Sequence, residues 1–439
     1  MAFWRSFAVA RMAALAMPVF VVLAVSPCSA ESPQPETGAG AQAANIPENY
    51  NCINCHRDLE DERLTPPVND WMESVHREVG VRCADCHGGA PFNDDLVKEP
   101  SEGFIGKPAA KDIPSLCAKC HSDAGAMRAY NQRSDQFALY QGSVHGKALE
   151  RGDSAAPTCI SCHGKHKILR VKDPNALVNR QNVPQTCGGC HSGQKLLGRK
   201  KMPANQLALY QQSWHYEKFK AGDLLVPTCV DCHSNHGIIR PSSQRVRTVC
   251  FNCHNAQAEN YKASAHWKAY KNQGEPVCLH CHSYHDISRP TLAKFTGQGD
   301  ADCAACHAED SRAYLVGKEI QTVMASTVGA VEAAGNALDD FRRNAHGGFE
   351  ISALTERMQK TGERLKELNA LTHKLDPAAV KKESEEMLKT AQAVSAEVDS
   401  MWAEIKTRQI GLAVAWVIFL GFGGALWMKA KALDRQRRD

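Results

Sequence analysis

The last third of the chain repeats apolar residues with a helical period. A first helix is expected from Glu309 to about Phe341, and a second helix after the turn at residues 345–348. Asp376 and Pro377 are residue types that cap and begin a third helix. The apolar spacings of three, four and seven predict a coiled seam, which closes either within one chain as a hairpin, as we favour, or between two chains as a dimer. The seam residues are Ile351, Leu354, Met358, Leu365, Leu368, Leu375, Val380, Met387, Ala391, Val394, Val398, Met401 and Ile405.

An uncharged run at residues 410–428 follows the third helix. It is long enough to cross a bilayer once, and the alternative is a buried helix of a soluble protein. The excess of basic residues after the run predicts that the C-terminal tail lies in the cytoplasm. These basic residues are Lys429, Lys431, Arg435, Arg437 and Arg438.

A second apolar run, at residues 12–25, lies near the N-terminus after Arg5 and Arg11. The small residues 28–30 close it, which predicts a secretory signal peptide cleaved after Ala30. An uncleaved anchor is one alternative, and lipidation of Cys28 is another. Residues 31–45 lack periodicity and are expected to form a flexible leader.

Between these ends, from about residue 51 to residue 307, long aliphatic runs are scarce and Gly, Pro, Asn and Asp are common. A peptide of this composition cannot build an ordinary core alone. We therefore expect this region to fold around covalently held apolar groups. The formal charge of +4 over 439 residues is small and gives no case for nucleic-acid binding.

Nine C-x-x-C-H motifs fill this region and contain 18 of the 19 cysteines, which leaves no pair for a structural disulfide. The two thiols of such a motif can reach the two vinyl groups of one haem, while the adjacent histidine binds the iron from the proximal side. The alternative, a set of zinc ribbons, does not require a histidine after every pair. The attachment cysteines are Cys52, Cys55, Cys83, Cys86, Cys117, Cys120, Cys159, Cys162, Cys187, Cys190, Cys229, Cys232, Cys250, Cys253, Cys278, Cys281, Cys303 and Cys306, and the proximal histidines are His56, His87, His121, His163, His191, His233, His254, His282 and His307.

A larger unit recurs four times around every second motif. An aromatic residue, a serine and a histidine precede the cysteines, as in Tyr210-Gln-Gln-Ser-Trp-His215, and in three copies another histidine follows the proximal one by three residues. A trailing histidine so close to its own proximal ligand cannot reach the distal face of the same haem, so it is expected to serve a neighbouring haem. The distal ligands predicted from the repeat are His76, His145, His166, His215, His236, His266 and His285.

Two of the nine distal positions are not supplied by the repeat. His346, beside Gly347 and Gly348, is the candidate for one of them, with a polar turn residue as its alternative role. The other stays open. His280 is expected to be exposed and His373 to be a solvent-facing helix residue, and the remaining candidates are Met72, Met127 and Met202.

These motifs resemble the multihaem c-type cytochromes, in particular proteins that combine C-x-x-C-H-x-x-H with upstream Ser-x-His ligands. The resemblance covers about residues 51–307. The helices after His307 are similar, more loosely, to the C-terminal part of the nitrite reductase and hydroxylamine oxidoreductase group, but the C-x-x-C-K motif of the nitrite reductases is missing. The membrane helix is C-terminal, whereas NapC-type quinol-oxidising cytochromes have theirs at the N-terminus.

The resemblance implies nine covalently bound haem c groups and low potentials suited to anaerobic respiration. We expect an electron carrier anchored in a bacterial inner membrane, with its haem domain in the periplasm, passing electrons between a membrane redox partner and a periplasmic or outer-membrane acceptor. It could act alone, as a homodimer or as a subunit of a larger complex. The alternative is an enzyme that acts on a small nitrogen or sulfur oxyanion at one five-coordinate haem.

The predicted fold is mainly α-helical with much irregular structure: short helices and loops around the haems, a long-helix hairpin and one transmembrane helix. The predicted segments are a signal peptide (1–30), a leader (31–45), a nine-haem domain (46–307), a helical hairpin (308–408), a transmembrane helix (409–429) and a basic tail (430–439).

Overall fold

The computed structural model describes residues 50–58, 63–193, 203–240, 248–270, 278–297, 302–345 and 348–438. Within these ranges the chain is mainly helical and contains no strand. The predicted signal peptide and leader lie outside the described residues. The fold class expected from the sequence is therefore confirmed: short helices and loops, then long helices, of which the last carries the apolar run.

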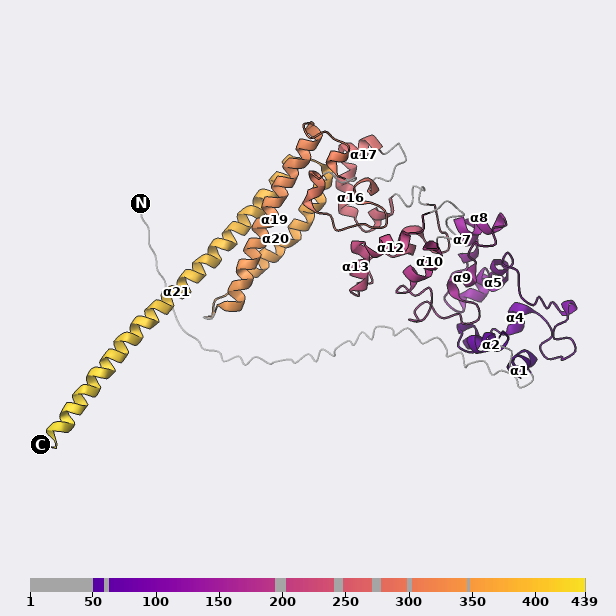
Figure 1. Cartoon of the computed structure of the whole chain (residues 1–439), viewed down its shortest axis with the longest axis horizontal. Coiled ribbons are helices and arrows are strands. Elements are labelled where there is room, and N and C mark those ends of the chain that lie inside the picture. The colour runs from indigo at the N-terminus through magenta and orange to yellow at the C-terminus, as the bar shows by residue number, and fades with distance from the viewer. Residues whose placement is uncertain are drawn as a thin grey trace, which may run out of the picture.

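Short helices separated by loops make up the haem-motif region, defined here as residues 50–307. In Figure 1 they follow one another in space in the order of the sequence, from α1 at the far end to α16 and α17 beside the long helices. The helices before residue 193 are α1 (Asn51–Asp58), α2 (Thr65–Met72), α3 (Val75–Glu78), α4 (Cys83–His87), η1 (Pro100–Glu102), α5 (Ile113–His121), α6 (Ala124–Arg128), α7 (Gln136–Gly142), α8 (Val144–Glu150), α9 (Cys159–His163) and α10 (Val183–His191). Those after residue 203 are α12 (Gln206–Gln211), α13 (Trp214–Lys220), α14 (Cys229–His233), η2 (Val249–Asn252), α16 (Asn255–Lys262), α17 (Ala265–Tyr270), α18 (Leu279–His282), η3 (Leu292–Phe295) and η4 (Cys303–Ala305).

The motif helices α4, α9, α14 and α18 each end at the motif histidine, and the next residue has a left-handed backbone. The φ angles are 69° at Gly88, 86° at Gly164, 70° at Ser234 and 64° at Ser283. Glycine adopts this conformation at little cost. At Gly88 a side chain would also collide with the backbone oxygen of Gly103, because a Cβ there would lie 1.9 Å from it. The chain therefore turns away sharply after the proximal histidine.

Apolar side chains are sparsely buried in the haem-motif region. A small core forms at its far end around Tyr50, Ile53, Val68 and Trp71. Beyond it, buried apolar residues are scattered singly, as at Ile113, and no second cluster of them is found in the described part of this region. This scarcity agrees with the expectation that covalently attached apolar groups complete the core.

Three long helices form the bundle that follows: α19 (Arg312–Asn344), α20 (Ser352–Leu371, continued by η5, Thr372–Lys374) and α21 (Pro377–Gln436). Side chains cap the starts of α19 and α21. Ser311, which was not predicted as a cap, accepts a hydrogen bond from the backbone N–H of Tyr314, and the predicted cap Asp376 accepts one from Ala379 at 3.1 Å. The three helices pack side by side within one chain, as Figure 1 shows.

The seam predicted from the sequence lies in the core of this bundle. Val380 and Val394 are fully buried, and Met387 and Val398 nearly so. Their partners on α19 include Ile320, Met324 and Phe341, and the ring centroid of Phe341 lies 5.1 Å from that of Trp402. A buried hydrogen bond joins the hydroxyls of Thr327 and Ser384 across the same core, so the polar residues there are paired.

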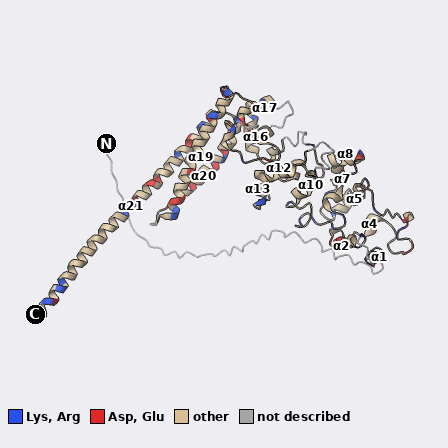
Figure 2. Cartoon of the chain, viewed as in Figure 1, with Lys and Arg blue, Asp and Glu red and all other residues tan. Residues whose placement is uncertain are grey.

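Helix α21 continues without a break from the bundle into the apolar run. Among the described residues it is the one helix long and apolar enough to cross a membrane, and its most apolar window is fully exposed. In Figure 2 this part of α21 is free of charge and ends in basic residues. The protein can therefore anchor in a membrane through its C-terminal helix.

We predict that Met387→Ala destabilises the bundle. Met387 is 1% exposed in the seam, so truncation should cost about 2–5 kcal/mol, the range for methionine-to-alanine changes in cores. Denaturant unfolding followed by helical circular dichroism of the full chain in detergent measures this cost. Glu385→Ala, at an exposed position two residues earlier, is the control and should change stability by less than about 0.5 kcal/mol. Equal effects of the two changes would show that the seam does not stabilise the bundle.

Candidate haem-binding site

The aromatic residue that opens each repeat ties its helix to the following motif. The hydroxyl of Tyr140 donates to the backbone oxygen of Pro157 at 2.8 Å, and the hydroxyl of Tyr210 donates to that of Pro227 at 2.9 Å. In the first copy, Trp71 Nε1 donates to the oxygen of Val81 at 3.0 Å. Each acceptor lies two residues before the first cysteine. The aromatic residue therefore fixes the start of the motif relative to the helix that carries the upstream histidine.

The serine of each repeat holds the upstream histidine by capping its helix. Ser143 Oγ accepts from the backbone N–H of Gly146 at 2.9 Å, and Ser213 Oγ accepts from that of Tyr216 at 3.0 Å. Ser74 caps the first copy in the same way, through the N–H of His76. The serines are almost fully buried, so the caps are shielded from water.

Successive repeats also interlock through the backbone. The N–H of Val75 donates to the oxygen of Ile168 at 2.9 Å, and that of Val144 donates to Ile238 at the same distance. In the third copy Trp214 donates to Ile287 at 2.8 Å. Each donor precedes an upstream histidine by one residue and each acceptor follows a trailing histidine by two. One hydrogen bond therefore sets the position of both histidines.

Each upstream histidine faces the proximal histidine of the plain motif that follows its own repeat unit. The ring-centroid distances are 6.1 Å for His76 and His121, 6.3 Å for His145 and His191, 6.3 Å for His215 and His254, and 5.9 Å for His266 and His307.

The trailing histidines face backwards, towards the motif of the preceding repeat. Each trailing histidine therefore passes over one motif, whereas the sequence predicted only that it serves a neighbouring haem. The ring-centroid distances are 6.2 Å for His166 and His87, 6.0 Å for His236 and His163, and 6.1 Å for His285 and His233.

His373 completes the same series at the bundle. It lies in η5 with its ring centroid 6.1 Å from that of His282, and the two ring planes differ by 22°. The sequence predicted a solvent-facing residue, and this was wrong, because the turn between α20 and α21 packs against the haem-motif region at α16. The repeat pattern could have indicated this role. His282 belongs to the last repeat, so its facing histidine has to come from a later part of the chain.

The remaining candidates from the sequence do not join an imidazole pair in the described residues. His280 is exposed and lies beside Tyr270, at a centroid distance of 5.5 Å. His346 and Met202 lie outside the described residues, so the prediction for His346 stays a prediction. Met72 packs with the small core at the far end, and Met127 is buried in α6.

These eight imidazole pairs fit haem iron. Two imidazoles that bind opposite sides of one ion at about 2 Å each have ring centroids about 6 Å apart. All eight distances lie close to that value. In every pair one histidine directly follows two motif cysteines, so a group held by those thiols would lie at the gap between the rings.

The electrostatic environment favours neutral imidazoles, the form that can bind a metal. Burial, with smaller contributions from the facing His236 and from His121, lowers the pKa of His163 to about 4. Burial and the facing His373 likewise lower the pKa of His282 to about 4. Burial is also the main cause of the lowered pKa of His76.

The motif cysteines of adjacent motifs lie next to one another. The first cysteines lie close enough to interact in the first and second motifs, the third and fourth, the fifth and sixth, and the seventh and eighth. The four thiol pairs are Cys52 with Cys83, Cys117 with Cys159, Cys187 with Cys229, and Cys250 with Cys278.

The intervening junctions are looser and use the second cysteine of the earlier motif. There the thiols are close enough to interact electrostatically without a hydrogen bond between them. The contacts are Cys86 with Cys120, Cys162 with Cys187 and Cys190, Cys232 with Cys250 and Cys253, and Cys281 with Cys306. The nine motifs therefore form one continuous series in sequence order.

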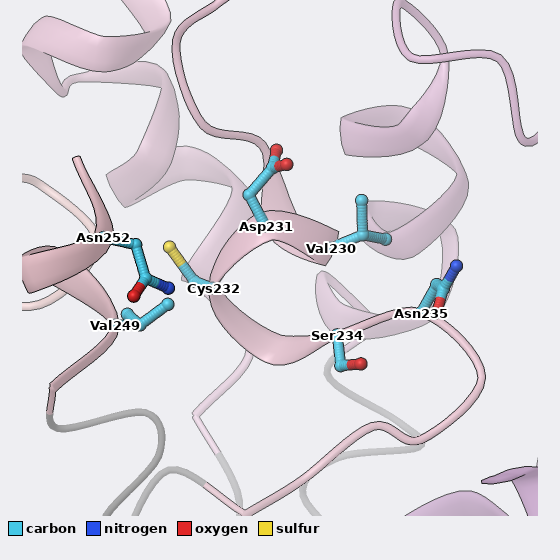
Figure 3. A pocket seen from close by; sticks show the side chains of 7 residues that line it. All are labelled: Val230, Asp231, Cys232, Ser234, Asn235, Val249 and Asn252. Carbon is cyan, nitrogen blue, oxygen red and sulfur yellow. The ribbon is translucent and has the colours of Figure 1, made fainter.

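A cavity of about 270 Å³ lies at one of these looser junctions. Val230, Cys232 and Ser234 of the α14 segment line it, together with Val249 and Asn252 of η2 (Figure 3). Open space beside an attachment cysteine is what a covalently held group requires.

Comparisons with known proteins agree with this geometry. Residues 75–195 match the family model described as cytochrome c3, and residues 219–259 match the doubled C-x-x-C-H model. The chain is 28% identical over 281 residues to the multiheme cytochrome MtrA of Shewanella baltica, covering 60% of this chain and 68% of MtrA. It is 22% identical over 197 residues to the polyheme cytochrome OmcC of Geobacter sulfurreducens, covering 41% of this chain and 24% of OmcC. No solved structure matches.

We predict that Ser213→Ala loosens the helix that carries His215, because it removes the hydroxyl that accepts from Tyr216. Losing such a cap costs about 1 kcal/mol. Hydrogen exchange of the α13 amides in the full chain should become roughly five times faster, since 1.4 kcal/mol corresponds to tenfold. Ser213→Thr keeps the acceptor and serves as the control. Unchanged exchange in the alanine variant would contradict the capping role.

Proposed function

Because this chain is a multihaem c-type cytochrome, we propose that it relays electrons between a membrane redox partner and a periplasmic or outer-membrane acceptor. The observation that carries the proposal is the unbroken series of motif contacts from Cys52 to Cys306. A relay requires each redox group to adjoin the next, and this series supplies the adjacency. The relatives named above, both multihaem cytochromes, support the same role.

Nine haem c groups are proposed, one for each motif, with the 18 motif cysteines as attachment points. Each bound haem supplies a one-electron iron couple. The eight imidazole pairs would hold eight of the irons, with the repeat histidines and His373 as distal ligands. Because each repeat histidine would serve a motif other than the one in its own repeat unit, haem binding would tie successive motifs together.

The bundle is proposed to act as a stalk that separates the haems from the bilayer. The part of α21 from Pro377 to Gln409 has 33 residues and spans about 50 Å at about 1.5 Å per residue. The haem-motif region contacts the opposite end of the bundle, at η5 and α20 (Figure 1). The membrane partner is therefore expected to reach well out from the bilayer, which disfavours quinol within the bilayer as the direct donor.

The orientation is proposed from charge. Basic residues follow the apolar run on its C-terminal side, as Figure 2 shows, and such residues favour the cytoplasm. The haem-motif region then lies in the periplasm of a bacterial inner membrane, where a signal peptide at residues 1–30 would deliver it. In this orientation the anchor limits the protein to partners at or near the inner membrane.

We predict that the whole series exchanges electrons as one unit. Full-length protein adsorbed on an electrode should pass as many electrons per chain as it has haems, with the haems counted separately by their pyridine complexes. Nine is the number expected, at low potential because imidazole pairs favour the oxidised iron. An electrode charge that accounts for only some of the counted haems would show that the series is broken and would overturn the relay.

We predict that His373→Gly opens one iron. Removing the imidazole that faces His282 should convert one haem per chain from low spin to high spin in the paramagnetic resonance spectrum. His280→Gly and His346→Gly are the controls and should leave the spectrum unchanged. A new high-spin signal in the His346 variant, with none in the His373 variant, would assign the eighth position to His346 and contradict the pairing proposed here.

A further inference from the structure

We infer that the haem at Cys52, Cys55 and His56 has an exchangeable distal position and binds small external ligands. This inference rests on the proposed haem attachment. It makes the first motif a ligand-binding site at the far end of the series, whereas the other eight irons are closed by two imidazoles.

His56 is built as an iron ligand. Its Nδ1 lies 3.2 Å from the backbone oxygen of Leu64, which leaves Nε2 free for the metal and fixes the ring orientation. His87 is held in the same way, with Nδ1 at 2.7 Å from the oxygen of Gly106. The first motif therefore has the proximal side of an ordinary haem site.

The same motif is supported by its own small core. Tyr50 and Ile53 are almost fully buried against Val68 and Trp71, and Cys52 and Cys83 pack on this cluster. Tyr50 Oη also accepts a hydrogen bond from the backbone N–H of Ala84 at 3.1 Å, which ties the first motif to the second. The site is therefore held in place even though it lies at the end of the series.

The pairing rule explains why no imidazole in the described part of the chain faces His56. The proximal histidine of the third motif and that of the fifth are each faced by the upstream histidine of the repeat unit just before them. His121 is faced by His76, and His191 by His145. The first motif would need such a unit ahead of Cys52, and residues 1–49 contain no histidine.

The other histidines of the chain are accounted for elsewhere. Sixteen form the eight pairs, which leaves His56, His280 and His346 of the 19. His280 lies beside Tyr270 near the bundle. The described neighbours of His346, Ala345 and Phe349, pack into the bundle core, whereas α1 lies at the opposite end of the haem-motif region (Figure 1).

Met72 is also unsuited to the distal position. By its place directly after the repeat aromatic residue, it corresponds to Gln141, Gln211 and Lys262 in the other copies, all of which are exposed. The helix that carries it, α2, packs on α1, as α7 packs on α5 in the next repeat. In that repeat the distal histidine comes from α3 and not from α7. By comparison with the next repeat, α2 is therefore expected to support the first motif and not to supply an iron ligand.

The ligands expected at this site are small π-acceptors. A reduced iron with one imidazole and one exchangeable position binds neutral diatomic molecules such as carbon monoxide and nitric oxide, whereas an iron between two imidazoles binds them only after losing a ligand. Carbon monoxide is the simplest probe because it does not change the redox state of the iron.

The test is a carbon monoxide titration of the reduced full-length protein in detergent, followed by the Soret absorbance. Wild-type protein should bind one carbon monoxide per chain. His166→Gly removes the imidazole that faces His87 and should raise the uptake to two. Wild-type protein that binds none, with a His166 variant that binds one, would overturn the inference and leave the proposed haem pairing intact. A His166 variant with unchanged uptake would instead contradict the pairing itself.

Met72→Leu keeps the volume of the side chain and tests the methionine that packs beside Cys52 as a distal ligand. Uptake should stay at one carbon monoxide per chain. An increase from none to one in this variant would show that the Met72 sulfur holds the distal position and that the inference is wrong. The resonance spectrum of the oxidised protein gives a second measure, because one high-spin iron per chain is expected in wild type and in Met72→Leu alike.

Discussion

The arrangement of the haem-motif region depends on one constraint: two imidazoles must face each other across a gap of about 6 Å, and they come from different repeats. His163 faces His236 at 6.0 Å although 73 residues separate them in sequence. A backbone hydrogen bond beside the histidines, such as that from Val144 to Ile238, holds the two repeats together at this point. Local structure and the imidazole pairing are thus set by the same contacts, which explains how a region with few buried apolar residues keeps a defined order of motifs.

The repeat also explains the ends of the series. Each unit contributes one histidine forwards and the last three also contribute one backwards, so the four units leave one unmet requirement at each end of the series. At the end next to the bundle, His373 meets the requirement of His282 from the turn between two long helices. At the other end His56 faces no imidazole among the described residues, and the small core around Tyr50 and Trp71 supports the motif instead. The bundle thus carries both the apolar run and one of the paired imidazoles.

The sequence predicted the helical seam, the membrane helix and the motif histidines, because each depends on spacing within one segment. Val380, Met387 and Val394 recur every seven residues and are buried accordingly. It did not predict that His166 passes over the nearest motif to face His87, or that His373 points inwards. Those outcomes depend on how distant segments pack, and local periodicity carries no information about that. The bonds from Tyr140 and Tyr210 to prolines 17 residues later could have been found, since the spacing recurs.

The two kinds of junction between motifs have different consequences for a relay. Where the first cysteines of two motifs interact, as in Cys117 and Cys159, two attachment points lie side by side. Where the second cysteine of one motif faces the next motif, as Cys162 faces Cys187, the thiols interact electrostatically, and a cavity lies at the equivalent junction beside Cys232. Close and loose contacts therefore alternate along the chain. Any motion within the series is expected at the loose junctions, because the cavity leaves space beside the thiols there.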